Sequence, residues 1–205
     1  MSTIVFQEHR FIGHLEKLVK EQDRGALAAL RRGLGKPPGM AREMDRHILP
    51  YLPPDTREKQ EDAYYIAGAL FAYWHQGKDS VDPNPPANIG ASLYALVKQD
   101  VAADTSNRKL EDKWKDAEKR TEKRMVALLN CHSDDLPEHL RHVISLLKAK
   151  DIPVNWLQLL NDVQNWQRES RNVQRSWARQ FWRFSSQDKP ADNKPETKTE
   201  EIEEE

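Results

Sequence analysis

The sequence has a single cysteine, Cys131, among its 205 residues. It therefore cannot form an intrachain disulfide framework, which favours the reducing cytoplasm. No run of eighteen apolar residues occurs, so we expect neither a membrane-spanning helix nor a membrane partner. The first residues, MSTIVFQEHRF, lack the basic region and apolar stretch of a secretion signal. We accordingly expect a cytoplasmic protein.

Sequence motifs of common catalytic sites are also missing. The patterns GxxxxGK[ST], GxGxxG, HExxH and GxSxG do not occur. The one candidate metal cluster consists of Cys131, His132, His139 and His142. It has only one thiolate and matches no standard zinc spacing. We therefore predict a protein that is not an enzyme and has no metal, cofactor or small-molecule substrate.

Alternating strand patterns are absent too, whereas helical spacing of apolar residues runs through the chain. The pattern predicts an all-α fold with helices over about 3–21, 24–33, 40–48, 57–75, 88–100, 106–129, 136–147, 156–166 and 172–184. Asn155 is a candidate N-cap for the eighth of these helices. The loop QGKDSVDPNPPANIG separates two helical groups, 1–80 and 88–187, which we expect to form one compact bundle.

The formal net charge of -1 averages two unlike parts. Residues 188–205 contain three lysines and eight acids, with no aromatic residue and a single isoleucine. The preceding residues therefore hold 29 basic and 25 acidic residues, a net charge of about +4. The acidic tail is too polar to bury a core, and its composition predicts disorder.

The stretch RESRNVQRSWARQFWR, residues 168–183, has five arginines and one glutamate. On one continuous helix, at about 100° per residue, its arginines fall within an arc of about 120°. They are Arg168, Arg171, Arg175, Arg179 and Arg183. An apolar stripe on the opposite side comprises Val173, Trp177, Phe181 and Phe184, and Trp182 lies at the edge of the arginine row, where its ring is available for stacking on a base. An exposed helix face usually mixes charges, because like charges one turn apart repel. The row predicts binding to phosphate or to an acidic partner, with a solvated helix face as the alternative. If Glu169 and Ser170 begin a new helix, Arg168 leaves the row.

Two further groups of basic residues follow apolar helix faces. One comprises Arg141, Lys148 and Lys150. The other comprises Arg24, Arg31 and Arg32. Each group alone is weak evidence for binding. If the fold brings both together with the arginine row, they form a groove for a phosphate backbone.

Four blocks of the sequence together resemble the CasB family, the small subunit of the type I-E CRISPR surveillance complex, Cascade. They are GALAALRRGLGKPPG (25–39), NIGASLYAL (88–96), DLPEHLRHVISLLKAKDIPVNWLQLLNDVQNW (135–166) and VQRSWARQFW (173–182). The resemblance extends in order over about 13–187. The chain departs from the family pattern in a longer N-terminus, a highly charged stretch at 107–124, and the acidic tail.

This resemblance implies an all-helical, non-catalytic subunit. Members of the family sit as two copies along the complex, against the backbone subunits that hold the guide RNA. The implied partners are the large subunit, the backbone subunits, a second copy, guide RNA and target DNA. The family's basic surface faces the displaced DNA strand and helps to keep the R-loop open, while cleavage belongs to a separate nuclease–helicase.

The resemblance and the helix geometry give one set of candidate nucleic-acid-binding residues. Positions within the matching blocks are Arg31, Arg32, Arg141, Lys148, Lys150, Arg175 and Arg179. Arg168, Arg171 and Arg183 rest on helix geometry alone. Three other interpretations stay open. They are a helical adaptor whose arginine row binds an acidic protein surface, a helix-turn-helix regulator, and an enzyme.

Overall fold

The computed structural model describes residues 3–37 and 40–188, and for residues 3–5 and 183–188 it describes the backbone alone. The α-helices are α1 (Thr3–Lys20), α2 (Arg24–Arg31), α3 (Asp45–Ile48), α4 (Glu58–Trp74), α5 (Ile89–Ala103), α6 (Leu110–Asn130), α7 (Leu136–Ala149), α8 (Trp156–Gln164) and α9 (Asn172–Asp188). Two 3-10 turns, η1 (Arg42–Met44) and η2 (Leu49–Tyr51), flank α3. All regular structure in the described residues is helical, which confirms the predicted all-α class. The predicted disordered tail lies outside the described residues from position 189 onward.

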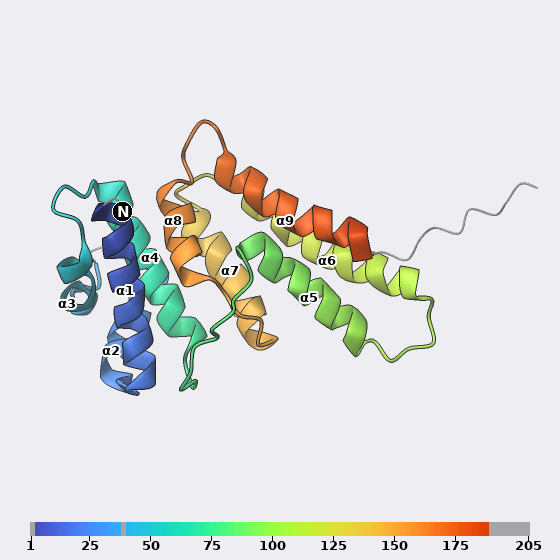
Figure 1. Cartoon of the computed structure of the whole chain (residues 1–205), viewed down its shortest axis with the longest axis horizontal. Coiled ribbons are helices and arrows are strands. Elements are labelled where there is room, and N and C mark those ends of the chain that lie inside the picture. The colour runs from blue at the N-terminus through green and yellow to red at the C-terminus, as the bar shows by residue number, and fades with distance from the viewer. Residues whose placement is uncertain (1–2, 38–39, 189–205) are drawn as a thin grey trace, which may run out of the picture.

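The helices are grouped in space differently from their order in the chain (Figure 1). Helix α4 packs against α2, α7 and α8, and α8 also contacts α1. Helix α5 packs against α6 and α9 at the other end of the molecule. One continuous apolar cluster includes buried residues from α1 through α9. The division into groups 1–80 and 88–187 remains a prediction, and the later helices α7 and α8 pack against the earlier α4.

Three of the helices have an N-cap residue whose side-chain oxygen accepts a backbone hydrogen bond. Asp23, Asn88 and Asn155 each accept a backbone N–H bond in the first turn of α2, α5 and α8, respectively. Such caps satisfy amide groups that have no partner within the helix. The predicted cap at Asn155 is confirmed, with a distance of 3.0 Å to the Gln158 nitrogen.

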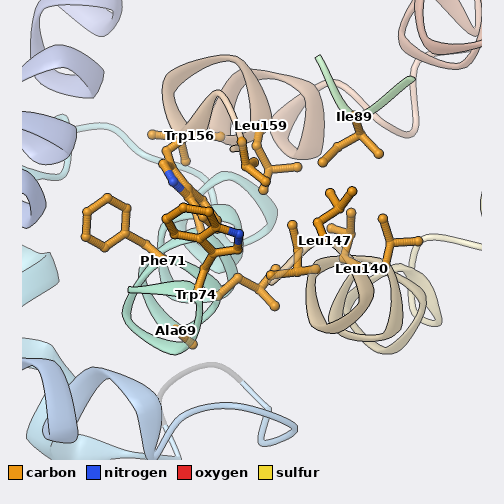
Figure 2. Packing of buried hydrophobic residues seen from close by; sticks show 14 of the residues in the cluster. Ala69, Phe71, Trp74, Ile89, Leu140, Leu147, Trp156 and Leu159 are labelled. Atoms are coloured by element: carbon orange, nitrogen blue, oxygen red, sulfur yellow. The ribbon is translucent and has the colours of Figure 1, made fainter. Parts of the chain in front are cut away.

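Aromatic packing joins the end of α4 to α8 (Figure 2). The Trp156 ring lies edge-on to Phe71, with 5.3 Å between ring centroids, and 6.4 Å from Trp74. The Trp74 indole nitrogen donates a buried 3.2 Å hydrogen bond to the Ile152 carbonyl, in the segment between α7 and α8. Buried indole N–H groups need a hydrogen-bond partner. By supplying that partner, the Ile152 carbonyl holds the segment after α7 against the end of α4.

The helix predicted over 172–184 begins where expected, whereas the single continuous helix on which the arginine row from Arg168 was placed is wrong at its start. Helix α9 begins at Asn172, after α8 has ended at Gln164. Between them the chain turns, and Arg171 adopts a φ of 48° while its carbonyl accepts the first helical bond from Arg175. This turn reverses the chain so that α9 can pack against α5. Arg168 and Arg171 therefore lie outside the helix that carries Arg175.

The buried side of α9 matches the predicted apolar stripe. Val173, Trp177 and Phe181 are all buried, and the side chain of Phe184 lies outside the described residues. Trp177 also donates a 2.6 Å hydrogen bond to the carboxylate of Asp162 in α8, which is only 5 % exposed. Burial raises the pKa of Asp162 to about 6, although hydrogen bonds from Trp177 and Gln158 partly oppose that rise. The hydrogen bond between Asp162 and Trp177 thus links α8 to α9. The free-energy cost of burying the Asp162 carboxylate rises with pH, because its charged form is the one that burial penalises.

We predict that Asp162→Asn stabilises the protein at alkaline pH. The raised pKa means that protonation favours the folded state. The contribution of Asp162 protonation to the free energy of unfolding is complete below about pH 4. It is lost as the pH rises through about 6, the pKa of Asp162 in the folded state. An asparagine avoids the buried charge and still accepts from Trp177. Urea denaturation should therefore show a gain of roughly 1–3 kcal/mol at pH 8 and none at pH 4.

A control for this prediction is Asp162→Ala, which leaves the Trp177 N–H unpaired. It should lower the free energy of unfolding at both pH values. Equal stability of the wild type and Asp162→Asn at pH 8 would contradict the raised pKa of Asp162 in the folded state.

Gly90 permits the close approach of α5 and α9. A Cβ atom at this position would lie 2.0 Å from the carbonyl oxygen of Trp177. Because that neighbour is backbone, it cannot rotate away as a flexible side chain can. The absence of a side chain at Gly90 therefore sets how closely the two helices pack.

We predict that Gly90→Ala lowers the free energy of unfolding by about 1–3 kcal/mol, since the helices must separate to admit the methyl group. Gly13→Ala is the matched control, because a Cβ atom on Gly13 of α1 meets nothing within 4 Å. That control should stabilise the protein by roughly 0.5–1 kcal/mol through helix propensity. Thermal and urea unfolding measure both, and equal effects of the two variants would exclude the steric explanation.

Candidate nucleic-acid interface

Four cations from three parts of the chain meet on one surface, here called the α2–α7 cluster. They are Arg24, Arg31, Lys78 and Lys148. The first three line a pocket of about 390 Å³ between α2 and the loop after α4. Lys148 of α7 is close enough that the charges of Arg31 and Lys78 act on it. Partial burial, followed by these two charges, lowers its pKa. The fold thus brings together Arg24 and Arg31 from one predicted basic group and Lys148 from another.

The two lysines of the cluster, Lys78 and Lys148, contact aromatic residues at the end of α4. The Lys148 Nζ atom donates to the Tyr73 carbonyl at 2.5 Å and lies 4.6 Å from the centroid of the Tyr73 ring. The Lys78 Nζ atom lies 3.5 Å from the Trp74 ring centroid and contacts the exposed Asp151. Both lysines thus make cation–π contacts, in which the face of the ring attracts the cation.

Lys78 is absent from the predicted site. It stands in the loop after α4, where Gly77 turns the chain with a φ of 85°. A lysine in a polar loop carries no periodic signal, so the sequence could not connect it to Arg31 or Lys148. Arg24 has a sequence signal, since it lies two turns before Arg31 on the same side of α2.

Three predicted site residues contact carboxylates of the protein itself. The pairs are Arg32 with Glu43, Arg141 with Glu138 at 2.8 Å, and Lys150 with Asp100 at 2.7 Å. The cations of these pairs are all well exposed, and exposed pairs contribute little to stability, about 0–1 kcal/mol each. They can therefore be exchanged for other anions at small cost. A role of these residues in nucleic-acid binding stays a prediction.

The remaining predicted arginines belong to α9 and the turn before it. Arg175 and Arg179 are exposed, one helical turn apart, and no carboxylate of the described residues forms an ion pair with them. Arg171 is exposed and donates to the Leu129 carbonyl at 2.6 Å, whereas Arg168 is exposed on the turn. Arg183 is part of α9, but its side chain lies outside the described residues.

Trp182 is less available for stacking than the sequence suggests. Its side chain is partly buried against the core, and its indole nitrogen donates to Glu122 of α6 at 3.2 Å. The expected ring beside the arginine row is instead a contact between α9 and α6.

The α9 arginines lie apart from the α2–α7 cluster. Helices α2 and α9 are at opposite ends of the molecule (Figure 1). A single groove that joins all three predicted basic groups is therefore not what the fold forms. The described residues present separate basic surfaces instead.

Features typical of other protein classes are weak in the part of the chain that the structure describes. Its His, Cys, Asp and Glu side chains form no group of three that could hold a metal ion. Burial and the nearby Asp135 charge raise the pKa of Cys131 to about 11, so its thiol is protonated at neutral pH. No described helix has both the length and the hydropathy needed to cross a bilayer.

The described residues thus form an all-helical fold with exposed basic surfaces. The profile of the CRISPR-associated protein Cse2 family matches residues 26–182, which is most of the chain. The chain therefore belongs to the Cse2 family, also called CasB, the small-subunit family of type I-E Cascade.

Known members of this family are similar over nearly their whole length. The Cse2 protein of Thermus thermophilus is 27 % identical over 175 residues, which cover 84 % of this chain and 88 % of the relative. A crystal structure of a Cse2-family protein from the same organism has a TM-score of 0.65 at 25 % identity, with 89 % of this chain and 99 % of that chain covered. A chain of a CRISPR RNA-guided surveillance complex in a pre-nicking state has a TM-score of 0.68 at 25 % identity, covering 90 % and 96 %.

The geometry of the α2–α7 cluster can be tested without any ligand. We predict that Arg31→Gln raises the pKa of Lys148, because it removes one of the cations that disfavour the charged ammonium. NMR titration of the lysine side-chain carbons measures this change. Arg175→Gln, on the distant α9, is the matched control and should leave Lys148 unaffected. An unchanged titration in Arg31→Gln would show that the two side chains do not meet.

Proposed function

We propose that this protein is the non-catalytic small subunit of a type I-E CRISPR RNA-guided surveillance complex in the cytoplasm. Its basic surface binds nucleic acid without reading sequence and stabilises the R-loop and the displaced strand. Its partners are the large subunit, the backbone subunits, a second copy of itself, guide RNA and target DNA. Membership in the Cse2 family supports the place in the complex.

The observation that carries the nucleic-acid role is the convergence of Arg31, Lys78 and Lys148 from separate segments. Asp151 contacts only Lys78 of these three cations, so their mutual repulsion is partly offset within the protein, and a bound polyanion would neutralise the rest. Arginine forks grip phosphate oxygens, and lysine adds a point charge, so neither has to read a base. Strand exchange in guide-directed complexes is nearly balanced, so non-specific contacts to a backbone are enough to favour the open state.

The α9 arginines support a second function, which is adaptor binding to an acidic protein surface. Arg175 and Arg179 are exposed and lie at the opposite end of the molecule from the α2–α7 cluster. An isolated arginine pair is suited to a carboxylate-rich patch of a neighbouring subunit as well as to phosphate. The two surfaces can thus serve different partners within one complex.

The central test replaces Arg24 and Arg31 with glutamate in the assembled complex. Both side chains lie on α2 and have no ion-pair partner among the described residues, so folding should be little affected. We predict that target-DNA affinity falls roughly tenfold or more at about 100 mM salt, and that its salt dependence becomes shallower. Fluorescence anisotropy across a salt series measures both quantities.

The matched control is Lys17→Glu with Lys20→Glu on neighbouring α1, which makes the same charge change at exposed positions. Normal target binding by the Arg24/Arg31 variant across the salt series would exclude the α2–α7 cluster as a nucleic-acid site.

The α9 pair is tested by Arg175→Glu with Arg179→Glu. On the nucleic-acid hypothesis, the complex assembles and binds target DNA less tightly. On the adaptor hypothesis, the subunit is lost from the complex while the affinity of the free protein for DNA stays the same. Size-exclusion chromatography and DNA titration of the same preparation separate these two results.

A further inference from the structure

Helix α6 carries most of the highly charged stretch over 107–124, and its two halves differ in charge pairing. At its N-terminal end, Arg108 contacts Asp104 at 2.7 Å and Asp116 at 2.6 Å, and Lys113 lies 3.9 Å from Asp104. These charges neutralise one another locally, which gives this end of α6 a structural explanation.

The C-terminal half of α6 has cations without such partners. Arg120, Lys123 and Arg124 are exposed, and none of them forms an ion pair with a carboxylate of the described residues. Their spacing of three and four residues places them on one side of the helix. Like charges at this spacing repel, so the helix is less stable for carrying them without a counterion.

These three cations share a pocket with the neighbouring helix. The pocket holds about 480 Å³ between α6 and α7 and is lined by Arg120, Lys123, Arg124, Ala127, His139, His142 and Val143. Its lining includes no acidic side chain. Glu138 lies beside it on α7, where it contacts Arg141 at 2.8 Å and His142 at 3.2 Å. That carboxylate is already engaged, so the cations of α6 face an open space that suits an anion.

Helix α7 separates this pocket from the α2–α7 cluster. His139 and His142 face α6, as the lining of the pocket shows. On the other side of α7, Ser145 accepts a 3.0 Å hydrogen bond from Tyr73 of α4, and Lys148 donates to the Tyr73 carbonyl. The two basic surfaces therefore lie on opposite flanks of the same helix.

We propose that the α6–α7 pocket is a second phosphate-binding site, which takes a nucleic-acid backbone independently of the α2–α7 cluster. The inference rests on the proposed nucleic-acid function. Two guanidinium groups and an ammonium group on one helix face can each neutralise a phosphate. The imidazole of His139 adds a ring N–H donor for a phosphate oxygen, whereas the ring of His142 is held by Glu138. The charged stretch thus gives this chain an additional contact to a nucleic-acid strand.

The test uses the full-length chain and fluorescently labelled single-stranded DNA of mixed sequence. We expect Lys123→Gln with Arg124→Gln to weaken binding roughly tenfold at about 100 mM salt, equally for different sequences. The slope of log affinity against log salt should become shallower by about 1.4, which corresponds to two lost phosphate contacts on a single strand. Circular dichroism confirms that the variant stays folded.

Lys115→Gln with Lys119→Gln is the matched control. Both lysines are exposed on α6 and are absent from the pocket lining, so the helix and the charge change are the same. The control should leave both affinity and salt slope unchanged. An equal loss of affinity in the control would mean that only net charge matters, and it would overturn the proposed site.

Combination with Arg24→Gln and Arg31→Gln tests independence and separates the two proposals. Independent sites predict that the losses in binding free energy add. If the α2 variant weakens binding and the α6 variant does not, the second site is wrong and the proposed function stands. If neither variant weakens binding, both are wrong. If the α6 variant loses another subunit of the complex while binding DNA normally, the pocket takes an acidic protein segment, which also overturns the inference.

Discussion

Packing at the C-terminal end of α4 is the constraint on which the main basic surface depends. Trp74 is buried against Trp156, and its indole nitrogen donates to the Ile152 carbonyl, which fixes the segment after α7. The Nζ atom of Lys78 lies over the same tryptophan ring, and the Nζ atom of Lys148 lies over the ring of the neighbouring Tyr73. The apolar contact between α4, α7 and α8 therefore places two cations from different parts of the chain beside Arg31. Loss of that packing would scatter the cluster even if every cation were kept.

The distribution of carboxylates determines which cations are available to a partner. Basic residues are spread over the whole chain, but several contact acids nearby, as Arg141 does with Glu138 and Lys150 with Asp100. Clusters such as the one around Arg31 and the face of α6 around Lys123 have fewer such contacts. Whether a basic surface is available to a polyanion thus depends on the lack of nearby carboxylates as much as on its own cations. This view also explains how a chain with a formal net charge of -1 can present polyanion-binding surfaces.

The position of α9 shows how a core contact orients an exposed one. Gly90 lets α5 approach the Trp177 backbone, and Asp162 binds the Trp177 indole from α8. With the tryptophan side of α9 fixed in this way, Arg175 and Arg179 point outward. The buried carboxylate of Asp162 makes this arrangement less stable at high pH, because burial penalises its charged form.

Helices and buried faces could be predicted from the sequence because they follow from local spacing, and the family could be predicted from the resemblance of four sequence blocks. The periodicity of apolar residues gave the stripe at Val173, Trp177 and Phe181, and a single polar residue, Asn155, marked the start of α8. The start of α9 was among the expected helix bounds, but the loss of Arg171 from the arginine row was not, since it depends on how the chain turns before α9 to reach α5. The convergence of Lys78 with Arg31 and Lys148, and the pairing of Arg32 with Glu43, were likewise decided only by the tertiary structure. Charge interactions act between side chains that the helix crossings bring together, and no local pattern in the sequence records those crossings.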